Sequence, residues 1–280
     1  MHDLAGRTAF ITGGASGFGL TLAATLLDER MRVVIADVDE RRLAQATDHL
    51  RAIAPSVSAI ICDVSKPDDL QRAARHTVDT FGAVHVVCNN AGVLAPGALE
   101  NANAADWNWS FSVNVVGVVN GIAAFLPHIR AHGEGGHVVN TASMAGFRGL
   151  PYASAYCASK AAVISISESL AAELEGSNIG VTVLCPGFMR TALYEHSLDR
   201  PVRYGGPKTA LADPNATNPT QLADAIAAGL DPQRVAQRTV QAIRQNDFYV
   251  VTHPQHRPDI AARGERILQA YDQAALDASS

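Results

Sequence analysis

The sequence has few charged residues and few cysteines, and both shortages exclude classes of protein. Only 18% of the 280 residues are charged and 48% are hydrophobic, a balance typical of a folded chain rather than a disordered one. The formal net charge is -5 and no basic stripe runs along the chain, so we expect no nucleic-acid partner. No CxxC pair occurs among Cys62, Cys88, Cys157 and Cys185, which argues against a disulfide framework or a zinc site and for a cytoplasmic protein.

Long apolar runs are also missing. The longest stretch, Val113 to Leu126, contains Asn114 and Asn120 and is shorter than the roughly 20 residues of a membrane-spanning helix. The first residues enter a strand pattern without the charged and then apolar segment of a secretion signal. No internal repeat or low-complexity tract occurs. We therefore expect neither a membrane anchor nor secretion.

Short β-branched runs alternate with longer helical patterns over the whole chain. The expected strands are Thr8–Thr12, Val33–Ala36, Val57–Cys62, Val84–Cys88, His137–Asn140, Val181–Leu184 and Phe248–Thr252. The expected helices are Gly19–Glu29, Glu40–Ala52, Pro67–Phe81, Ala104–Ala131, Ala155–Glu175, Pro232–Gln245 and Ala261–Ala274. Continuously apolar strands are buried on both faces. The pattern predicts one α/β domain over residues 1–280, with a Rossmann-type doubly wound parallel sheet of about seven strands and helices on both faces.

The segment 191–231 differs in composition from the rest. It contains four prolines and a Gly205-Gly206 pair, and it follows the expected sixth strand. A long connection at the carboxyl end of a parallel strand is typical of a substrate loop or lid. An irregular surface loop is the alternative.

A glycine-rich turn follows the first strand at Thr12-Gly13-Gly14-Ala15-Ser16-Gly17-Phe18-Gly19. Glycine lets the main chain approach a pyrophosphate closely, and the helix that follows presents unpaired N–H groups to it. Taken alone, the turn could also be a tight strand-to-helix connection without a ligand.

Asp37 closes the second strand, at the distance from the glycine turn where a carboxylate meets the adenosine ribose. The carboxylate would accept bonds from the ribose hydroxyls and would repel a 2'-phosphate, so NAD is favoured over NADP. Arg41 and Arg42 follow closely and could neutralise such a phosphate, so NADP stays open.

Ser143, Tyr156 and Lys160 form the candidate proton-transfer set. Tyr156 and Lys160 are four residues apart and share one face of a predicted helix. A neighbouring ammonium favours the phenolate, so we expect Lys160 to lower the pKa of Tyr156 towards the range of a general base. Each residue taken singly could equally be a loop cap, a half-buried aromatic or a surface charge.

Several motifs in order resemble the short-chain dehydrogenase/reductase family up to about Thr191, and more loosely beyond. These motifs are the glycine turn, Asp63-Val64, Asn89-Asn90-Ala91-Gly92, Asn114, Asn140-Thr141-Ala142-Ser143, Tyr156 with Lys160, Pro186-Gly187 and Thr191. The resemblance implies a coenzyme site of Gly13, Ser16, Gly17, Phe18, Gly19, Asp37, Asp63, Val64, Asn90, Ala91, Gly92, Tyr156, Lys160, Pro186, Gly187, Phe188 and Thr191.

The resemblance also implies how the reaction runs. Tyr156 exchanges the alcohol proton, Ser143 binds the substrate oxygen, Lys160 holds the nicotinamide ribose, and Asn114 positions a water on the proton path. Hydride passes directly between coenzyme and substrate carbon, and no metal is required. The function that we expect is interconversion of a secondary alcohol and its ketone with NAD. The alternatives are an NADP-dependent carbonyl reductase and a non-catalytic NAD sensor.

The expected substrate walls are mostly apolar and would suit a bulky or aromatic small molecule. Their residues are Leu94, Ser143, Phe147, Leu150, Tyr152, Phe188, Met189, Leu193 and Tyr194. The insertion and the last strand resemble family members acting on aryl alcohols, including lignin-type Cα-dehydrogenases. Cys157 is expected to be a small buried side chain, and His253 and His256 to lie in a surface segment rather than to bind a metal.

Assembly is expected from the two longest apolar helices, Ala104–Ala131 and Ala155–Glu175. They carry more hydrophobic surface than one face of a sheet covers, which indicates burial against another subunit. The family resemblance implies a homotetramer or homodimer. A wider intramolecular core is the alternative.

Overall fold

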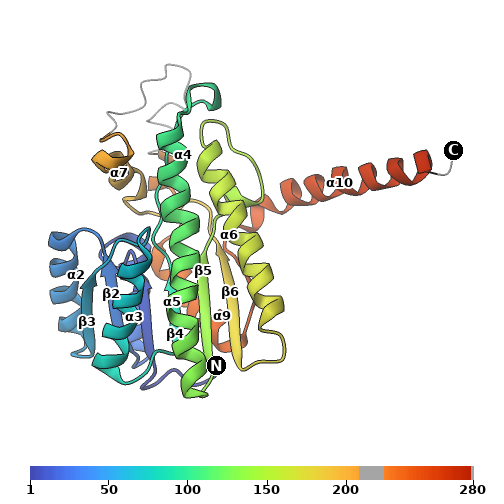
Figure 1. The fold of residues 1–280 in the computed structure, drawn as a ribbon. Helices are drawn as coiled ribbons and strands as arrows, with labels where there is room; N and C mark the ends of the chain where they lie inside the picture. The colour runs from blue at the N-terminus through green and yellow to red at the C-terminus, as the bar shows by residue number, and fades with distance from the viewer. Residues whose placement is uncertain (208–223, 279–280) are drawn as a thin grey trace.

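The computed structural model describes residues 1–207 and 224–278, and it confirms the doubly wound parallel sheet. Seven parallel strands form one sheet in the order β3-β2-β1-β4-β5-β6-β7 (Figure 1). The strands are β1 (Thr8–Thr12), β2 (Arg32–Asp37), β3 (Val57–Ile61), β4 (Val86–Asn89), β5 (Gly136–Thr141), β6 (Ile179–Cys185) and β7 (Tyr249–Val251). The strand order reverses between β1 and β4, and in such sheets ligands bind beyond the carboxyl ends at this point.

Helices cover both faces of the sheet. Those on one face are α1 (Gly17–Asp28), α2 (Glu40–Ile53) and α9 (Pro232–Gln245), and those on the other are α3 (Pro67–Phe81), α5 (Gly117–His132) and α6 (Ser154–Glu173) (Figure 1). The described residues form two large buried apolar clusters, one on each side of the strands, and a smaller cluster under α6. Phe10 and Phe125 stack at 4.1 Å between ring centroids on the α5 side. Strands β1, β2 and β4 are buried on both sides, as their unalternating apolar sequences predict.

One predicted helix is interrupted. The expected helix Ala104–Ala131 consists of α4 (Ala104–Phe111), a π-helical turn at Ser112–Val116, and α5. A π turn inserts one extra residue into the helical repeat, which hydrophobic periodicity does not reveal, and such turns are frequent at functional sites. The C-terminal helix is longer than expected, since α10 runs from Arg257 to Ala278.

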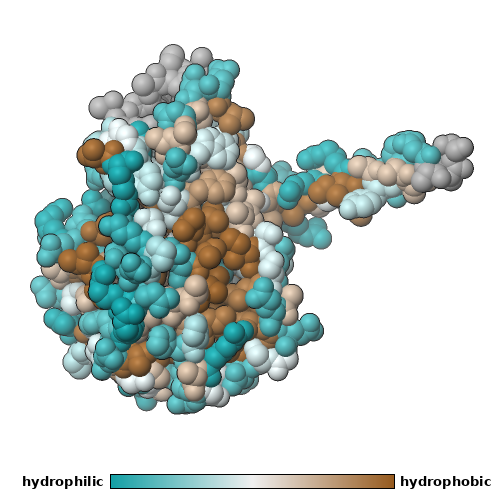
Figure 2. Space-filling view, viewed as in Figure 1, coloured by the Kyte–Doolittle hydropathy of each residue, from teal (hydrophilic) through white to brown (hydrophobic). Residues whose placement is uncertain are grey.

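The continuous helical run Ala104–His132 is long and apolar enough to cross a membrane by composition alone. Half of its most apolar window is buried inside the fold, as in a core helix packed on a sheet. Val116 and Val119 are exposed, and Figure 2 shows apolar surface over α5. Length and hydropathy are weak evidence for a single span, and the packing of α5 on β4 accounts for the apolar face.

The two ends of the segment after β6 are hydrogen-bonded to each other. Arg190 N donates to Leu230 O at 3.0 Å, and Leu230 N donates to Phe188 O at 2.9 Å. Between these points the chain forms α7 (Leu193–Leu198) and a 3-10 turn at Val202–Tyr204. Positions 208–223 of the predicted insertion lie outside the described residues.

Candidate active site

A cleft of about 630 Å³ opens at the carboxyl ends of the central strands. It is lined by residues from the turn after β1, the ends of β2 to β5, the start of α6 and the segment after β6. All of the residues predicted to hold the coenzyme line this cleft: Gly13, Ser16, Gly17, Phe18, Gly19, Asp37, Asp63, Val64, Asn90, Ala91, Gly92, Tyr156, Lys160, Pro186, Gly187, Phe188 and Thr191. The sheet therefore gathers motifs that are far apart in the sequence.

The glycine turn between β1 and α1 has a geometry that only glycine permits. Gly13 and Gly17 have positive φ angles of 63° and 51°. A Cβ on Gly19 would lie 2.1 Å from the carbonyl oxygen of Gly13. The turn brings the backbone to the cleft at the N-terminus of the twelve-residue helix α1, which favours a phosphate group.

Asn90 stabilises this turn. Its side-chain amide donates to Thr12 O at 2.9 Å, while Thr12 Oγ1 accepts from the backbone N–H groups of Asn90 and Ala91 at 2.9 and 3.0 Å. These bonds join the loops after β1 and β4 on either side of the point where the strand order reverses. The side chain of Asn90 thus shapes the coenzyme site by holding its walls together.

Asp37 stands at the end of β2 facing the glycine turn. Its carboxylate accepts from Ala15 N at 3.3 Å and from Asp39 N at 3.1 Å. Arg42 also lines the cleft, and it pairs with Asp39 at 3.2 Å and with Asp199 at 3.4 Å. The place where the adenosine ribose is predicted therefore carries a negative charge, and the Arg42 guanidinium already has two carboxylate partners.

Tyr156 and Ser143 meet at the other end of the cleft. Tyr156 lies in the first turn of α6, where its phenol interacts with the side chain of Ser143, which follows β5. Ser143 Oγ also accepts from Ala145 N at 3.1 Å and donates to Pro186 O at 3.3 Å. These contacts fix the serine hydroxyl between the phenol and the segment after β6.

The pKa of Tyr156 differs from the prediction. Burial raises it to about 12, and the interaction with Ser143 acts in the opposite direction. Lys160 Nζ lies 5.7 Å from the centroid of the Tyr156 ring, so the expected lowering by the lysine does not outweigh burial. Bound oxidised nicotinamide carries a positive charge, which would favour the phenolate.

Lys160 is almost completely buried, at 3% exposed. Its Nζ donates to the carbonyl oxygen of Thr141 at 2.7 Å, and burial lowers its pKa to about 8. A Cβ on Gly92 would lie 3.4 Å from this Nζ. The ammonium is therefore held between the end of β5 and the loop after β4, on the wall where the nicotinamide ribose is predicted.

Asn114 lies in the π turn and is fully buried. Its side chain accepts from Val93 N at 2.8 Å and donates to Val93 O and to Ser159 Oγ, both at 2.9 Å. The amide thus ties the loop after β4 to α6 beside the lysine. The water that Asn114 is expected to position stays a prediction.

His253 is a site residue that the sequence interpretation missed. It was expected in a surface segment, and that expectation is wrong, because His253 is 7% exposed and its Nδ1 accepts from Gly187 N at 3.0 Å. A Cβ on Gly187 would lie 2.7 Å from the imidazole. The ring therefore packs under the Pro186-Gly187 segment. No local pattern points to this contact, since 66 residues separate the partners.

The predicted substrate wall is mostly in place. The predicted residues that line the cleft are Leu94, Ser143, Leu150, Tyr152, Phe188, Met189, Leu193 and Tyr194. Phe147 is not among the lining residues, because it packs against the apolar cluster under α6 and lies 6.1 Å from the Tyr249 ring. Cys157 is buried, as expected, and accepts from Leu150 N at 3.3 Å.

Helix α7 and the turn after it, which belong to the segment predicted as a substrate loop, form one wall of the cleft. Leu94 N donates to Ser197 Oγ at 2.9 Å, and His196 Nδ1 lies 3.4 Å from Ser16 Oγ. Arg200 forms a buried ion pair with Asp106 of α4 at 2.5 Å. These contacts join the segment after β6 to the glycine turn, the β4 loop and α4.

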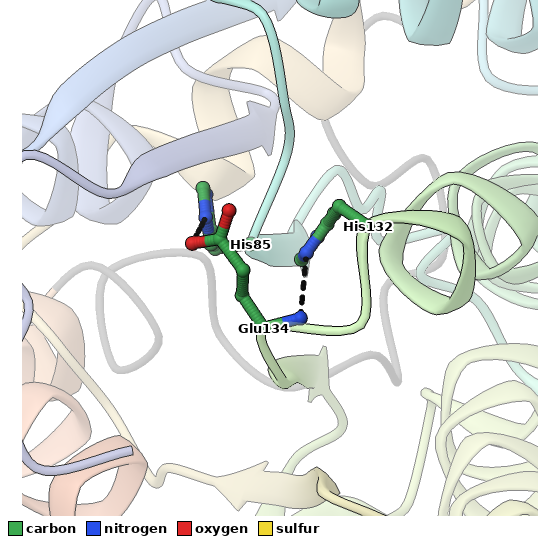
Figure 3. A group of neighbouring side chains, drawn as sticks. All are labelled: His85, His132 and Glu134. Carbon is green, nitrogen blue, oxygen red and sulfur yellow. Dashed lines mark hydrogen bonds and ion pairs between the residues drawn. The ribbon is translucent and has the colours of Figure 1, made fainter.

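A second group of titratable residues lies at the opposite edge of the sheet. His85, His132 and Glu134 come together before β4 and β5 (Figure 3). His85 accepts from Thr8 N at 3.1 Å and contacts Glu134 at 3.3 Å. His132 accepts from Glu134 N at 3.1 Å and donates to Val84 O at 2.8 Å. Both ring nitrogens of each histidine have a hydrogen-bond partner. The group is therefore better explained as a structural hydrogen-bond network than as a set of metal ligands.

Residues 7–201 match the model of the short chain dehydrogenase family. This chain belongs to the short-chain dehydrogenase/reductase family. It is 30% identical over 272 residues to a CLA biosynthesis dehydrogenase/reductase of Lactiplantibacillus plantarum, covering 96% of this chain and 95% of the relative. It is 31% identical over 271 residues to a C alpha-dehydrogenase of Sphingobium sp., covering 96% and 88%.

Solved structures show the same fold. A short-chain dehydrogenase/reductase from Burkholderia phymatum, in complex with NAD, has a TM-score of 0.91 and 37% identity, with 96% of this chain and 97% of that chain covered. LigO from Sphingobium sp. has a TM-score of 0.82 and 32% identity, with 98% and 92% covered. The chain is thus an oxidoreductase of a family that uses NAD or NADP, and the cleft described above fits such a dinucleotide.

Proposed function

We propose that this chain is an NAD-dependent dehydrogenase that interconverts a bulky secondary alcohol and its ketone. The observation that carries the proposal is the contact of Tyr156 with Ser143 beside the buried Lys160, in a cleft that also contains Asp37. A binding module that senses NAD has no need of this proton-transfer set, so its presence favours an enzyme.

The residues account for the movement of the proton. The coenzyme, when bound, accepts or supplies the hydride. Ser143 is placed to donate a hydrogen bond to the substrate oxygen, and the Tyr156 hydroxyl to exchange the proton with it. Lys160 holds a positive charge beside the phenol, which stabilises the anion formed when Tyr156 loses its proton. The alcohol proton therefore moves to the Tyr156 oxygen during oxidation and returns from it during reduction.

NAD is proposed over NADP because of the charge at the ribose end. A 2'-phosphate near Asp37 would meet a carboxylate, and Arg42 is already paired with Asp39 and Asp199. An NADP-dependent carbonyl reductase of the same fold is the alternative. Measuring the dissociation constants of NADH and NADPH decides between them, and tighter NADPH binding would overturn the NAD proposal. In Asp37→Ala, NADH should bind about 10-fold more weakly because a charged acceptor is lost, and NADPH more tightly.

A bulky apolar substrate is proposed from the cleft wall. Leu150, Tyr152 and Tyr194 line it. Arg148, which also lines the cleft, pairs with Asp259 at 2.5 Å, and Arg190 pairs with Asp231 at 3.1 Å. Apolar and aromatic walls favour an uncharged, ring-containing alcohol. The similarity to a C alpha-dehydrogenase supports an alcohol beside an aromatic ring.

The substrate proposal is tested by a paired panel. Secondary alcohols with an aryl substituent, matched aliphatic alcohols of equal carbon number, and hydroxy acids are each incubated with enzyme and NAD, and reduced coenzyme is followed by absorbance. The aryl alcohols should give the highest kcat/KM. A preference for hydroxy acids would contradict the assignment of the wall, while leaving the reaction class intact.

A further inference from the structure

The C-terminal arm, which is helix α10 (Arg257–Ala278), leaves the body of the molecule (Figure 1). At a rise of about 1.5 Å per residue its 22 residues extend about 33 Å. From Ala261 to Ala275 every residue except Gly264 is exposed. Helices in proteins gain most of their stability from packing an apolar face on a neighbour, and an internal glycine lowers the stability of the arm further. The arm therefore needs a surface to pack on.

The base of the arm is fixed to the cleft wall. Asp259 in the first turn accepts from Arg148 at 2.5 Å and lies 3.6 Å from His256, and both partners line the cleft. The direction in which the arm leaves the body is thus set by contacts on the substrate side. The arm is thus anchored at its base by an ion pair, and no residue from Ala261 to Ala275 is buried.

One side of the arm is apolar. Ile260, Gly264, Ile267 and Tyr271 recur at spacings of four, three and four, so they fall on one helix face, with Leu268 beside them. Ile267, Leu268 and Tyr271 are 47%, 60% and 72% exposed. Figure 2 shows hydrophobic residues midway along the arm. This arm stripe has the periodicity of a helix that packs against one other helix.

The arm is complementary to a reversed copy of itself. With a twofold axis between Ile267 and Leu268, Tyr271 lies opposite Gly264, where a Cβ would meet open space, and Ala275 lies opposite Ile260. Tyr271 and Ile260 thus each face a small residue, while Ile267 and Leu268 face each other across the axis. A parallel pairing would instead place Tyr271 against Tyr271.

Charge favours the same arrangement. The first half of the arm, residues 257–266, has three arginines and two acidic residues, Asp259 and Glu265, and a net charge of +1. The residues after position 266 include Asp272 and Asp277 and no lysine or arginine. Reversal brings the basic half of one arm beside the acidic half of the other. The acidic half also disfavours an anionic membrane surface, which attracts helices rich in lysine and arginine.

We propose that the C-terminal arms of two copies of this chain pair antiparallel through the arm stripe. The arm stripe of one copy therefore packs against the arm stripe of a second copy, and the interface is isologous. The pair would join subunits through segments that begin at the two substrate cleft walls. This proposal depends on the arm alone and does not rest on the proposed reaction.

The mass of the assembly tests whether the stripe is an interface. Ile267→Asp combined with Leu268→Asp should halve the mass measured by multi-angle light scattering, because one twofold contact is lost. Gln269→Asp adds a charge on the opposite side of the same turn and should leave the mass unchanged. An unchanged mass in the double variant overturns the proposal.

Cysteine crosslinking tests the antiparallel register. The native cysteines, Cys62, Cys88, Cys157 and Cys185, are buried. Under mild oxidation Leu268→Cys should form a disulfide-linked dimer, since it lies at the axis. Ile260→Cys alone should not, yet mixed with Ala275→Cys it should give a crosslinked pair.

Two outcomes contradict this register. Crosslinking of Ile260→Cys with itself would show a parallel pair. Absence of any crosslink, with the mass still halved by the aspartates, would place the arm on the body of the second copy instead.

Discussion

Arg203, in the turn after α7, donates to the carboxylate of Asp63 at 2.5 Å and to Ser65 Oγ at 3.1 Å. Asp63 follows β3 and lines the cleft at the end where the family resemblance predicts the adenine of the coenzyme, whereas Arg203 is 140 residues later in the chain. Burial would raise the pKa of the Asp63 carboxyl, but hydrogen bonds from Ser65 and Arg203 lower it. The ion pair therefore fastens the segment after β6 over the adenine side of the coenzyme site.

Loss of this contact should weaken binding of the adenine half of the coenzyme. In Arg203→Ala we expect the dissociation constants of NAD and AMP to rise about 3- to 10-fold, a modest effect because the guanidinium is partly exposed. Nicotinamide mononucleotide lacks adenine and should bind unchanged. Isothermal titration with all three ligands makes the comparison, and Arg234→Ala, an exposed residue on α9, is the control. Tighter NAD binding in the variant would show that Arg203 obstructs the site.

His253 should act as a positioning residue for the nicotinamide end. Replacing it with leucine removes the acceptor of the partly buried Gly187 N–H, which costs up to about 1–3 kcal/mol. We expect KM for NAD to rise about 10-fold with a smaller change in kcat. An asparagine side chain carries an acceptor oxygen in place of Nδ1, so His253→Asn should restore most of the affinity. If His253→Asn and His253→Leu behave alike in steady-state kinetics, the role of His253 is packing alone.

Comparing Arg203 and His253 with the glycine turn shows which features of the fold and the site could be predicted from the sequence. Strand–helix alternation and the Gly13–Gly19 spacing depend on neighbours in the chain, so the sheet and the coenzyme loop could be predicted. Arg203 and His253 act through partners 140 and 66 residues away, and nothing near them in the sequence indicates those partners. Phe147 was expected in the substrate wall but does not line the cleft. The direction of its side chain depends on the short 3-10 turn after Ser143, which the sequence does not indicate.

The direction of the Tyr156 pKa shift shows a second limit. The four-residue spacing to Lys160 correctly places both residues on α6, but the expected lowering ignored burial, which raises the pKa to about 12. Electrostatic effects depend on the depth of a group as well as on its neighbours. Periodicity gives the face of a helix on which a group lies, and the depth of the cleft comes only from the assembled fold.

His137 should make the protein sensitive to acid. It is fully buried in β5, its Nε2 contacts Thr182 Oγ1 at 2.7 Å, and burial lowers its pKa from 6.5 to about 3. Between these two values the unfolded chain binds more protons at this site than the folded chain. The free energy of unfolding is therefore highest above pH 6.5 and falls as the pH drops towards 3, by up to about 1.4 kcal/mol per pH unit.

Urea unfolding at a series of pH values measures this slope. In His137→Gln the difference between pH 7 and pH 4 should be smaller than in the native protein, even if the variant is less stable at both. An identical pH dependence in the two proteins would show that other groups control acid unfolding.

Tyr156→Phe tests the central claim, because it removes the phenol oxygen and keeps the ring. Stopped-flow measurement of a single turnover, with the NADH dissociation constant determined on the same sample, separates proton transfer from coenzyme binding. The account predicts that hydride transfer falls by about 10³-fold or more, as expected for loss of an acid–base group, while NADH binding stays within about twofold. Hydride transfer within about tenfold of the native rate, at unchanged NADH affinity, would contradict the account.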